Sequence, residues 1–324
     1  MKVVSLFSGA GGLDLGFIKA GHEIVWANDL YEDAVETYRN NIGNHIVCED
    51  IFAVEPDNIP DCDIVIGGFP CQGFSVANTK RNVADERNKL YKQLLRVIEA
   101  KSPKFFLAEN VKGIMSLGQG QVLKMILKDF ADAGYTVQAK VLNAADYGVP
   151  QLRQRVFIIG VRNDIDFNFN YPEPTHSVDG AGGLKKWISV GSALKGFPNP
   201  DEPNNVPNHE YSKYKLRFNG YIGHRMIDPK MPAPTVTARG DDKGGVVVLH
   251  HPNNQRRMSC RELATVQSFP KGYVFYGTRS SIYRQIGNAV PPALAYAVAK
   301  QFNNFEEDEY ATAELYSAKA VSRV

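Results

Sequence analysis

Short apolar segments alternate with segments of helical periodicity through the first 133 residues of the chain. The apolar segments predict strands at residues 3–7, 23–27, 45–48, 64–67 and 105–108. The segments between them predict helices at residues 13–20, 31–41, 89–99 and 121–133. This alternation is typical of βαβ units, in which helices cover both faces of a parallel sheet. Two further predicted strands, at residues 136–142 and 155–161, would extend the sheet as an antiparallel pair.

Beyond Arg162 the sequence becomes irregular. Residues 167–234 are rich in Pro, Asn and Gly, and no long helix fits there. Aromatic residues are interspersed in the same stretch, which indicates a smaller, loop-rich domain and not a disordered linker. Helical patterns return after residue 259 and at residues 291–302. The chain is therefore expected to combine an α/β domain with a second, irregular one.

The composition of the 324 residues excludes several classes of protein. No run approaches the ~20 apolar residues of a membrane span, and the N-terminal apolar run is too short for a secretion signal. The four cysteines show no CxxC spacing, which favours a reduced, cytoplasmic protein without a zinc site. The adjacent His250 and His251 lack neighbouring acids or cysteines and are expected at the surface.

Charge is distributed unevenly along the chain. Residues 209–284 contain 13 Lys or Arg against 5 Asp or Glu, a net charge of +8, which leaves −6 for the rest of the +2 chain. Such asymmetry is typical of a region that binds a polyanion, joined to a mildly acidic body. A basic, solvated surface is an equal alternative from charge alone.

The segment LFSGAGGLDLGF links the first predicted strand to the first predicted helix. Its glycines Gly9, Gly11 and Gly12 would let the backbone approach a ligand closely. Asp14 stands where the dinucleotide fingerprint GxGxxG needs its third glycine, and a carboxylate there disfavours a pyrophosphate. The loop therefore predicts an adenosine ligand that carries no phosphates.

Two acids follow the next two predicted strands. Asp29 closes the second strand, where an acid can bind ribose hydroxyls, and Asp50 follows the third, where it could accept from an adenine amino group. Either acid alone could equally be a helix N-cap. Acids at two successive strand ends favour a ligand site.

The segment VIGGFPCQGFS places Cys71 directly after the fourth predicted strand. In open α/β sheets, ligands bind at this carboxyl edge. Pro70 fixes its own φ and the flanking glycines remove side chains, so the thiol would point outward with room for a flat substrate. A buried structural cysteine is the alternative, but it would not need this turn chemistry. The stretch that follows has no buried-face period and predicts a mobile lid.

The segment FFLAENV ends in Glu109, which would lie at the same sheet edge. Apolar neighbours would raise the pKa of Glu109 towards neutrality, as a general acid requires. The segment QLRQRVF offers Arg153 and Arg155 at alternate strand positions, so both are expected on one face. Guanidinium groups suit carboxylates or a base carbonyl as partners.

Six segments, in this order, resemble motifs of the bacterial DNA (cytosine-5)-methyltransferases of type II restriction–modification systems. They are FSGAGG, GFPCQGFS, ENV, QLRQR, RELATVQSFP and QIGNAVPP. The resemblance spans nearly the whole chain. It implies the Rossmann-like methyltransferase fold, with a doubly wound mixed α/β sheet and a smaller, irregular target-recognition domain. The implied divisions are a catalytic, cofactor-binding domain at 1–178, a target-recognition domain and hinge at 179–270, and a hinge and C-terminal helix returning to the catalytic domain at 271–324.

The resemblance also implies a reaction, in which a methyl group passes from S-adenosyl-L-methionine to carbon 5 of a flipped-out cytosine in a specific double-stranded DNA sequence. The resemblance gives catalytic roles to three residues. Cys71 would add to carbon 6 and Glu109 would protonate ring nitrogen 3. Arg153 would hold the base carbonyl, with Arg155 in support. The implied cofactor contacts are Phe7, Gly9, Gly11, Gly12, Asp29, Asp50, Ile51, Pro70, Asn288 and Val290. Leu30 departs from the tryptophan that the family often has beside the ribose acid.

By the same resemblance, the basic region corresponds to the target-recognition domain, with Thr235-Val236 where the family has a Thr-Leu-type dipeptide. The candidate DNA contacts are Arg87, Arg225, Thr235, Arg239 and Lys243. Arg and Lys favour guanine edges, although a phosphate contact or a plain surface charge is an equal alternative for each. The expected partner is double-stranded DNA. Neither a membrane nor a metal is expected, and the protein is expected to be a cytoplasmic monomer that protects host DNA.

Three other functions compete with this interpretation. An RNA cytosine methyltransferase would share the fold, but the roughly 90 residues between QLRQR and RELATV favour duplex DNA reading. A catalytically silent DNA-binding module is disfavoured by the intact Cys71, Glu109 and Arg153. A nicotinamide-dependent dehydrogenase is disfavoured by the missing third glycine.

Overall fold

The computed structural model describes residues 1–70, 90–220, 224–238 and 248–305. A seven-stranded sheet of order β3-β2-β1-β4-β5-β7-β6 forms its centre, and β8 and β9 form a separate two-stranded sheet. The strands are β1 (Lys2–Leu6), β2 (Glu23–Asp29), β3 (Ile46–Cys48), β4 (Ile64–Gly67), β5 (Phe105–Val111), β6 (Tyr135–Asn143), β7 (Gln154–Arg162), β8 (His176–Ser177) and β9 (Lys185–Lys186). The first five strands pair in parallel, and β7 runs antiparallel to both β5 and β6.

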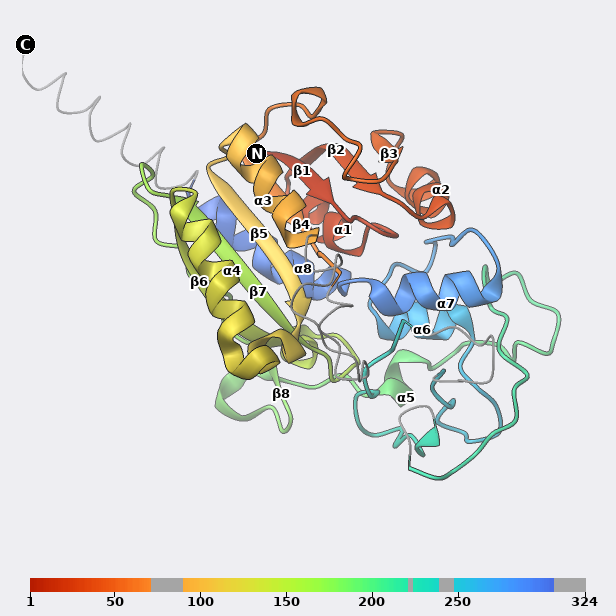
Figure 1. Cartoon of the computed structure of the whole chain (residues 1–324). Coiled ribbons are helices and arrows are strands. Elements are labelled where there is room, and N and C mark those ends of the chain that lie inside the picture. The colour runs from red at the N-terminus through yellow and green to blue at the C-terminus, as the bar shows by residue number, and fades with distance from the viewer. Residues whose placement is uncertain (71–89, 221–223, 239–247, 306–324) are drawn as a thin grey trace, which may run out of the picture.

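Helices cover both faces of the large sheet (Figure 1). The α-helices of the described residues are α1 (Gly12–Lys19), α2 (Glu32–Asn41), α3 (Leu90–Lys101), α4 (Gln121–Asp132), α5 (Val190–Ala193), α6 (Cys260–Val266), α7 (Arg279–Asn288) and α8 (Pro292–Ala299), of which α1–α4 and α8 pack on the sheet. Alternate strand residues enter two hydrophobic clusters because successive side chains of a strand point to opposite faces. One cluster joins the sheet to α1, α2 and α8, and the other joins it to α3 and α4.

The sequence predicted this sheet well. Each of the seven predicted strands forms within three residues of its expected ends, and the last two form the expected antiparallel pair. The four predicted helices of the first half also form. Helix α7 was not predicted, because its sequence, RSSIYRQIGN, carries few apolar residues. The mixed α/β, Rossmann-like fold class is thus confirmed.

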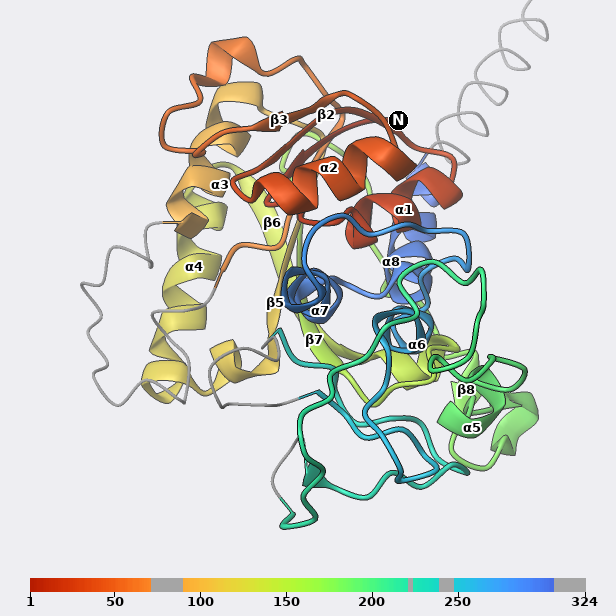
Figure 2. The ribbon, with the colours of Figure 1, turned by 90° about the vertical axis from the view of Figure 1, so that its right-hand side faces the viewer.

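The irregular part lies beyond the carboxyl ends of β4 and β5, below the arrowhead of β5 in Figure 1 and again below it in the turned view of Figure 2. Its only α-helix between residues 167 and 234, among the described residues, is the four-residue α5. A third hydrophobic cluster collects residues from 190 to 286 together with Ala10 of the first domain. The domain boundaries after residues 178 and 270 stay predictions.

Two buried arginines hold this loop-rich part together. Arg257 donates to the carbonyl oxygens of Tyr214, Lys215 and Val248, and no part of it is exposed. Arg261 is equally buried and donates to carbonyl oxygens of Pro207, Pro270 and Tyr273. Loops lack the internal ladders of helices and strands, so their buried carbonyls need side-chain donors. A guanidinium group, with five N–H donors, supplies several at once.

Within the described residues, no helix is both long enough and apolar enough to cross a membrane.

Helix α1 packs against α8 through Gly16. A Cβ at this position would lie 2.5 Å from the backbone of Ala295 and of Tyr296. Gly16→Ala is therefore expected to lower the free energy of unfolding by about 1–3 kcal/mol, because overpacking outweighs the gain in helix propensity. Urea denaturation measures the change. Gly272→Ala, where no heavy atom lies within 4 Å, is the control; a Gly16→Ala protein as stable as this control would contradict the packing.

Candidate active site

Parallel pairing brings the carboxyl ends of β1, β2, β4 and β5 to one edge of the sheet, and the antiparallel β7 begins at the same edge. The order changes direction between β1 and β4, since β2 and β3 lie on one side and β5 on the other. Such a switch point is where open α/β sheets bind ligands. Predicted cofactor and catalytic residues lie at this edge, among them Phe7 after β1, Asp29 at the end of β2 and Glu109 near the end of β5.

The loop after β1 adopts backbone conformations that few residues tolerate. Phe7, Gly9 and Gly11 have φ angles of 56°, 54° and 76°. A bulky residue such as Phe7 in this region stores strain, which persists where the surrounding structure fixes it. A Cβ at Gly11 would lie 3.0 Å from Tyr38 and 3.2 Å from the hydroxyl of Tyr273. The hydroxyl of Tyr273 also donates to the carbonyl oxygen of Ala10 at 2.6 Å.

Asp29 ties this loop to the end of β2. Its Oδ2 accepts from the backbone N–H of Gly9 at 2.8 Å, and its Oδ1 accepts from that of Tyr31 at 2.9 Å. Burial raises the pKa of Asp29, and the hydrogen bonds from Tyr31 and Gly9 oppose that shift. The carboxylate therefore sits between the glycine loop and the start of α2.

A second buried carboxyl, Asp14, lies in the first turn of α1. It accepts from the Ser5 hydroxyl at 2.8 Å and from the Tyr38 hydroxyl at 2.7 Å, and Tyr38 also lies 3.0 Å from His45 Nε2. Burial raises the pKa of Asp14 to about 6, although both hydroxyl hydrogen bonds lower it. Asp14 thus joins β1, α1 and α2 beneath the glycine loop, a structural role that the fingerprint comparison did not predict.

The chain between α7 and α8 closes the loop from the other side. A Cβ at Gly12 would overlap the carbonyl oxygen of Val290 and lie 3.1 Å from Ala289 Cβ. Val290 is buried, whereas Asn288, the last residue of α7, is exposed. Residues nearly 280 positions apart therefore meet at the glycine loop.

The surroundings of the glycine loop suit an adenosine ligand without phosphates. Residues 5–15 contain no Lys or Arg, and the carboxyl groups next to the loop are those of Asp14 and Asp29. Beyond β2, Leu30 is 58% exposed, and after β3 the aromatic ring of Phe52 is 47% exposed, so apolar surface is available for a flat base. Asp50 is exposed and its Oδ1 accepts from the backbone N–H of Phe52, while Ile51 is buried. Asp50 thus caps a turn at residues 51–53, whereas its alternative interpretation expected a helix N-cap.

Glu109 lies near the end of β5 and forms an ion pair with Arg155 of β7. Arg155 Nε lies 2.9 Å from Glu109 Oε1, and both side chains are about nine-tenths buried. Residue 109 is paired with Phe157, and residue 111 with Arg155, so the antiparallel register sets this contact. Burial raises the pKa of Glu109, while the positive charges of Arg155 and Arg153 oppose the shift. The direction agrees with the prediction from sequence.

The second oxygen of Glu109 faces the turn that precedes Cys71. A Cβ at Gly68 would lie 3.1 Å from Glu109 Oε2. Next to it, Asn110 Nδ2 donates to the carbonyl oxygen of Phe69 at 3.0 Å, and Asn110 Oδ1 accepts from the N–H of Val111. Asn110 therefore fixes the Gly68–Pro70 turn to β5. The sequence held one signal of this role, an amide residue directly after Glu109, and no role was predicted for it.

Arg153 lies just before β7 and is fully buried. Its guanidinium group donates to the carbonyl oxygens of Val236 at 2.8 Å, Gly287 at 2.8 Å and Ala289 at 3.0 Å. The two arginines thus have different surroundings, since Arg155 contacts the Glu109 carboxylate and Arg153 contacts backbone carbonyls.

The predicted DNA-binding residues are only partly described. Arg225 is exposed and its Nε donates to the carbonyl oxygen of Gly220. Thr235 donates to the carbonyl oxygen of Leu152 at 2.7 Å, which anchors residue 235 near the start of β7. Cys71, Arg87, Arg239 and Lys243 lie outside the described residues. No group of three or more His, Cys, Asp or Glu that could hold a metal occurs in the described ranges.

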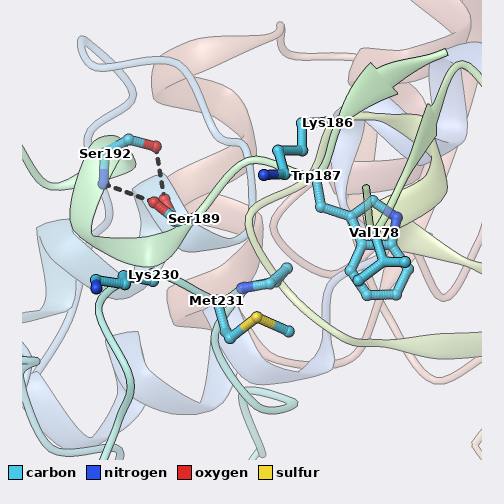
Figure 3. A pocket seen from close by; sticks show the side chains of 8 residues that line it. Val178, Lys186, Trp187, Ser189, Ser192, Lys230 and Met231 are labelled. Atoms are coloured by element: carbon cyan, nitrogen blue, oxygen red, sulfur yellow. Dashed lines mark hydrogen bonds between the residues drawn. The ribbon is translucent and has the colours of Figure 1, made fainter. Parts of the chain in front are cut away.

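A cavity of about 400 Å³ lies in the irregular part, away from these residues. Ser189 and Ser192, joined by two hydrogen bonds, lie on one side of it, and Trp187 lies on the other (Figure 3). Lys186, Lys230 and Met231 also contribute to its lining. None of its lining residues was predicted to bind the cofactor or take part in catalysis.

The mixed sheet, with a glycine loop after β1 and acids at its strand ends, fits the Rossmann-like methyltransferase fold. Comparison with known proteins makes the class specific. Residues 1–304 match the family described as C-5 cytosine-specific DNA methylase. The chain therefore belongs to the C-5 cytosine-specific DNA methylase family.

Individual relatives match over most of their length. The type II methyltransferase M.NgoFVII of Neisseria gonorrhoeae is 41% identical over 97% of this chain and 90% of its own. The type II methyltransferase M.BspRI of Lysinibacillus sphaericus is 39% identical over 95% of this chain and 82% of its own. A crystal structure described as a DNA modification methyltransferase encoded within an E. coli prophage has a TM-score of 0.76 at 26% identity, covering 95% of this chain and 99% of the other.

Asp14 predicts a pH dependence of stability. The folded protein holds the Asp14 proton up to about pH 6, whereas the unfolded chain loses it near pH 3.8, the ordinary pKa of an aspartate. The stability that this group contributes is therefore present at low pH and is lost as the pH rises to about 6. The side chain of Asp14→Asn has no proton to lose, so the variant lacks this loss of stability. From pH 4 to pH 7, the free energy of unfolding of the variant minus that of the wild type should rise by on the order of 2–3 kcal/mol.

Urea denaturation at pH 4, 5, 6 and 7 measures this difference. Asp57→Asn, at an exposed position, is the control and should follow the wild type throughout. An Asp14→Asn curve parallel to the wild type would contradict the assignment.

Proposed function

We propose that the protein transfers a methyl group from S-adenosyl-L-methionine to carbon 5 of a cytosine in double-stranded DNA, with Cys71 as the nucleophile. The observation that carries the proposal is the position of Glu109. Its carboxyl group is desolvated, paired with Arg155, and directed at the Gly68–Pro70 turn that precedes Cys71. An acid with a raised pKa next to a nucleophile is the arrangement that acid-assisted nucleophilic catalysis requires.

The cofactor would lie over the glycine loop at the β1–β4 switch point. Asp29 would bind the ribose hydroxyls, and the apolar surface of Leu30 and Ile51 would flank the adenine. The close approach of Gly12 to Val290 supports this placement, since it brings Asn288 and Val290 to the loop. When bound, the cofactor supplies an electrophilic methyl group on a sulfonium.

The remaining chemistry belongs to the residues of the chain. The Cys71 thiolate adds to carbon 6 of cytosine, which makes carbon 5 nucleophilic enough to take the methyl group. Glu109 donates its proton to ring nitrogen 3 and relieves the charge that the addition creates. A base then removes the proton from carbon 5, and the thiolate leaves with its bonding electrons. The target base must leave the duplex for this attack, because carbon 6 is not accessible within stacked DNA.

Arg155 is the better candidate for the base carbonyl, with Arg153 in the structural role. This exchanges the roles that the motif resemblance gave them. Arg155 reaches the Glu109 carboxyl through Nε, and a guanidinium group has further N–H donors for an oxygen of the base. The terminal nitrogens of Arg153 donate to three backbone carbonyls, so Arg153 would have to break hydrogen bonds to these carbonyls in order to bind a substrate.

DNA reading would be the task of the basic, irregular part, with Arg225, Thr235, Arg239 and Lys243 as candidate contacts and Arg87 contributing from the segment after Cys71. Relatives of the chain such as M.NgoFVII and M.BspRI are type II methyltransferases, the class that accompanies restriction enzymes. Protection of host DNA in such a system, action in the cytoplasm and a monomeric state belong to the same proposal.

Covalent trapping tests the proposed reaction. With S-adenosyl-L-methionine and duplex DNA containing 5-fluorocytosine, the wild type should form a denaturation-resistant complex. A base can remove hydrogen from carbon 5 as a proton but cannot remove fluorine in this way, so the thiolate cannot leave. Cys71→Ser should form none. Glu109→Gln should form it about 10²–10⁴ times more slowly, since a general acid contributes that much. Trapping by tRNA and not by DNA would instead favour the RNA methyltransferase alternative, and an adduct in Cys71→Ser would exclude this nucleophile.

A matched pair of substitutions separates the two arginines. Arg155→Lys keeps the charge but loses the planar fork, so kcat should fall by about 10²–10³ while the melting temperature stays close to that of the wild type. Arg153→Lys leaves buried carbonyls without donors, so the free energy of unfolding should fall by on the order of 3 kcal/mol. Methylation kinetics and urea denaturation read the two effects. A stable but inactive Arg153→Lys protein, beside an active Arg155→Lys protein, would restore the original roles.

A further inference from the structure

Two glutamines form a buried chain of side-chain amides between distant parts of the fold. Gln151 precedes β7 and Gln267 follows α6, and neither is exposed to solvent. Gln151 Nε2 donates to Gln267 Oε1 at 2.7 Å. A buried pair of this kind stabilises the fold only when every buried donor and acceptor has a partner. The partners of the two remaining amide groups therefore decide its effect.

Each outer end binds a different backbone segment. Gln151 Oε1 accepts from the N–H of Val236 at 2.8 Å. Gln267 Nε2 donates to the carbonyl oxygens of Ile286 at 2.5 Å and Ala289 at 3.2 Å. The chain therefore has one polarity, and turning either amide over would bring two donors or two acceptors together.

Those two segments contain predicted contacts to the two substrates of the proposed reaction, DNA and the cofactor. Val236 follows Thr235, the predicted DNA contact, and Ala289 stands between Asn288 and Val290, the predicted cofactor contacts. Arg153 spans the same gap, since it donates to the carbonyl oxygens of Val236 and Ala289.

The segments also touch directly. A Cβ at Gly287 would overlap the backbone of Thr237, and one at Gly12 of the cofactor loop would overlap Val290. Because backbone packs on backbone at both contacts, residues 235–237, the α7–α8 turn and the glycine loop cannot move independently of one another.

We propose that Gln151 and Gln267 are positioning residues that hold the DNA-binding segment at residues 235–237 and the cofactor-side turn at residues 287–290 in one register, so that each substrate binds more tightly when the other is present. The inference rests on the proposed function. Its physical basis is reciprocal. A ligand that orders one end of a continuous hydrogen-bonded chain reduces the entropy cost of ordering the other end, and thermodynamic linkage makes the effect equal in both directions.

Calorimetric binding of S-adenosylhomocysteine, alone and with saturating DNA, tests the pair without turnover. Bisulfite sequencing of DNA from cells that express the protein first identifies the methylated site. The DNA in the binding test is a short duplex that carries this site. The wild type should bind S-adenosylhomocysteine at least about 5-fold more tightly with DNA, the lower end of ordinary coupling. Gln267→Met removes the amide at similar volume and should bring that ratio close to 1, while affinity without DNA changes less than the ratio does.

Two further variants make the result specific. Gln138→Met is the matched control, because Gln138 Nε2 also donates to a backbone carbonyl, that of Phe169 at 2.7 Å, but on β6, away from both segments. It should lower the melting temperature and keep the full ratio. Gln151→Glu can still accept from Val236 but cannot donate to Gln267, so it should lose the ratio as Gln267→Met does. This second route keeps the test decisive if Gln267→Met does not fold.

The outcomes separate the two proposals. A wild type that binds neither S-adenosylhomocysteine nor DNA would overturn the proposed function and this inference with it. A wild type that binds both without mutual enhancement, or variants at Gln151 and Gln267 that keep the wild-type ratio, would overturn the inference alone.

Discussion

The guanidinium group of Arg153 lies in the interior and donates to backbone carbonyls of Val236, Gly287 and Ala289. Much of the structure depends on this contact. Residues 235–237 and the α7–α8 turn form no regular ladder there, so their buried carbonyls depend on side-chain donors such as this one. Arg257 and Arg261 act in the same way deeper in the irregular part. A domain with little secondary structure is thus ordered by a few buried cations whose donors are divided among several loops, and the cost of burying each charge is offset by hydrogen bonds and not by a single counter-ion.

The sheet explains why the chemistry gathers where it does. Parallel strands deliver the glycine loop, Asp29, the turn before Cys71 and Glu109 to one edge, and the reversed strand β7 brings Arg155 to the same edge. Desolvation raises the pKa of Glu109 there, while Arg155 limits the rise. The same edge faces the irregular part, so a nucleic acid held by that part would present its base to these groups.

Sequence predicted what depends on local pattern. Apolar runs and helical periods located the sheet, and glycine and acid positions located the ligand edge. What sequence did not reveal depends on partners far along the chain. Alternation placed Arg153 and Arg155 on one face, but only the fold shows that Arg153 donates to carbonyls more than 80 positions away. The present proposal therefore exchanges the roles that the motif resemblance gave them. The Gln151–Gln267 pair escaped notice for the same reason, since 116 positions separate the two residues. Helix α7 was missed because it is stabilised by packing and not by its own apolar pattern.

In the proposed mechanism, methylation begins with addition of a thiolate to cytosine carbon 6 and ends with removal of the proton from carbon 5. Tritium release measures this directly, with DNA labelled at carbon 5 of cytosine and S-adenosyl-L-methionine carrying a ¹⁴C-methyl group. One tritium should enter water for each methyl group transferred to DNA, at equal rates once the isotope effect is included. Methyl transfer to DNA without release of tritium would place the methyl group elsewhere on the base and would exclude this mechanism.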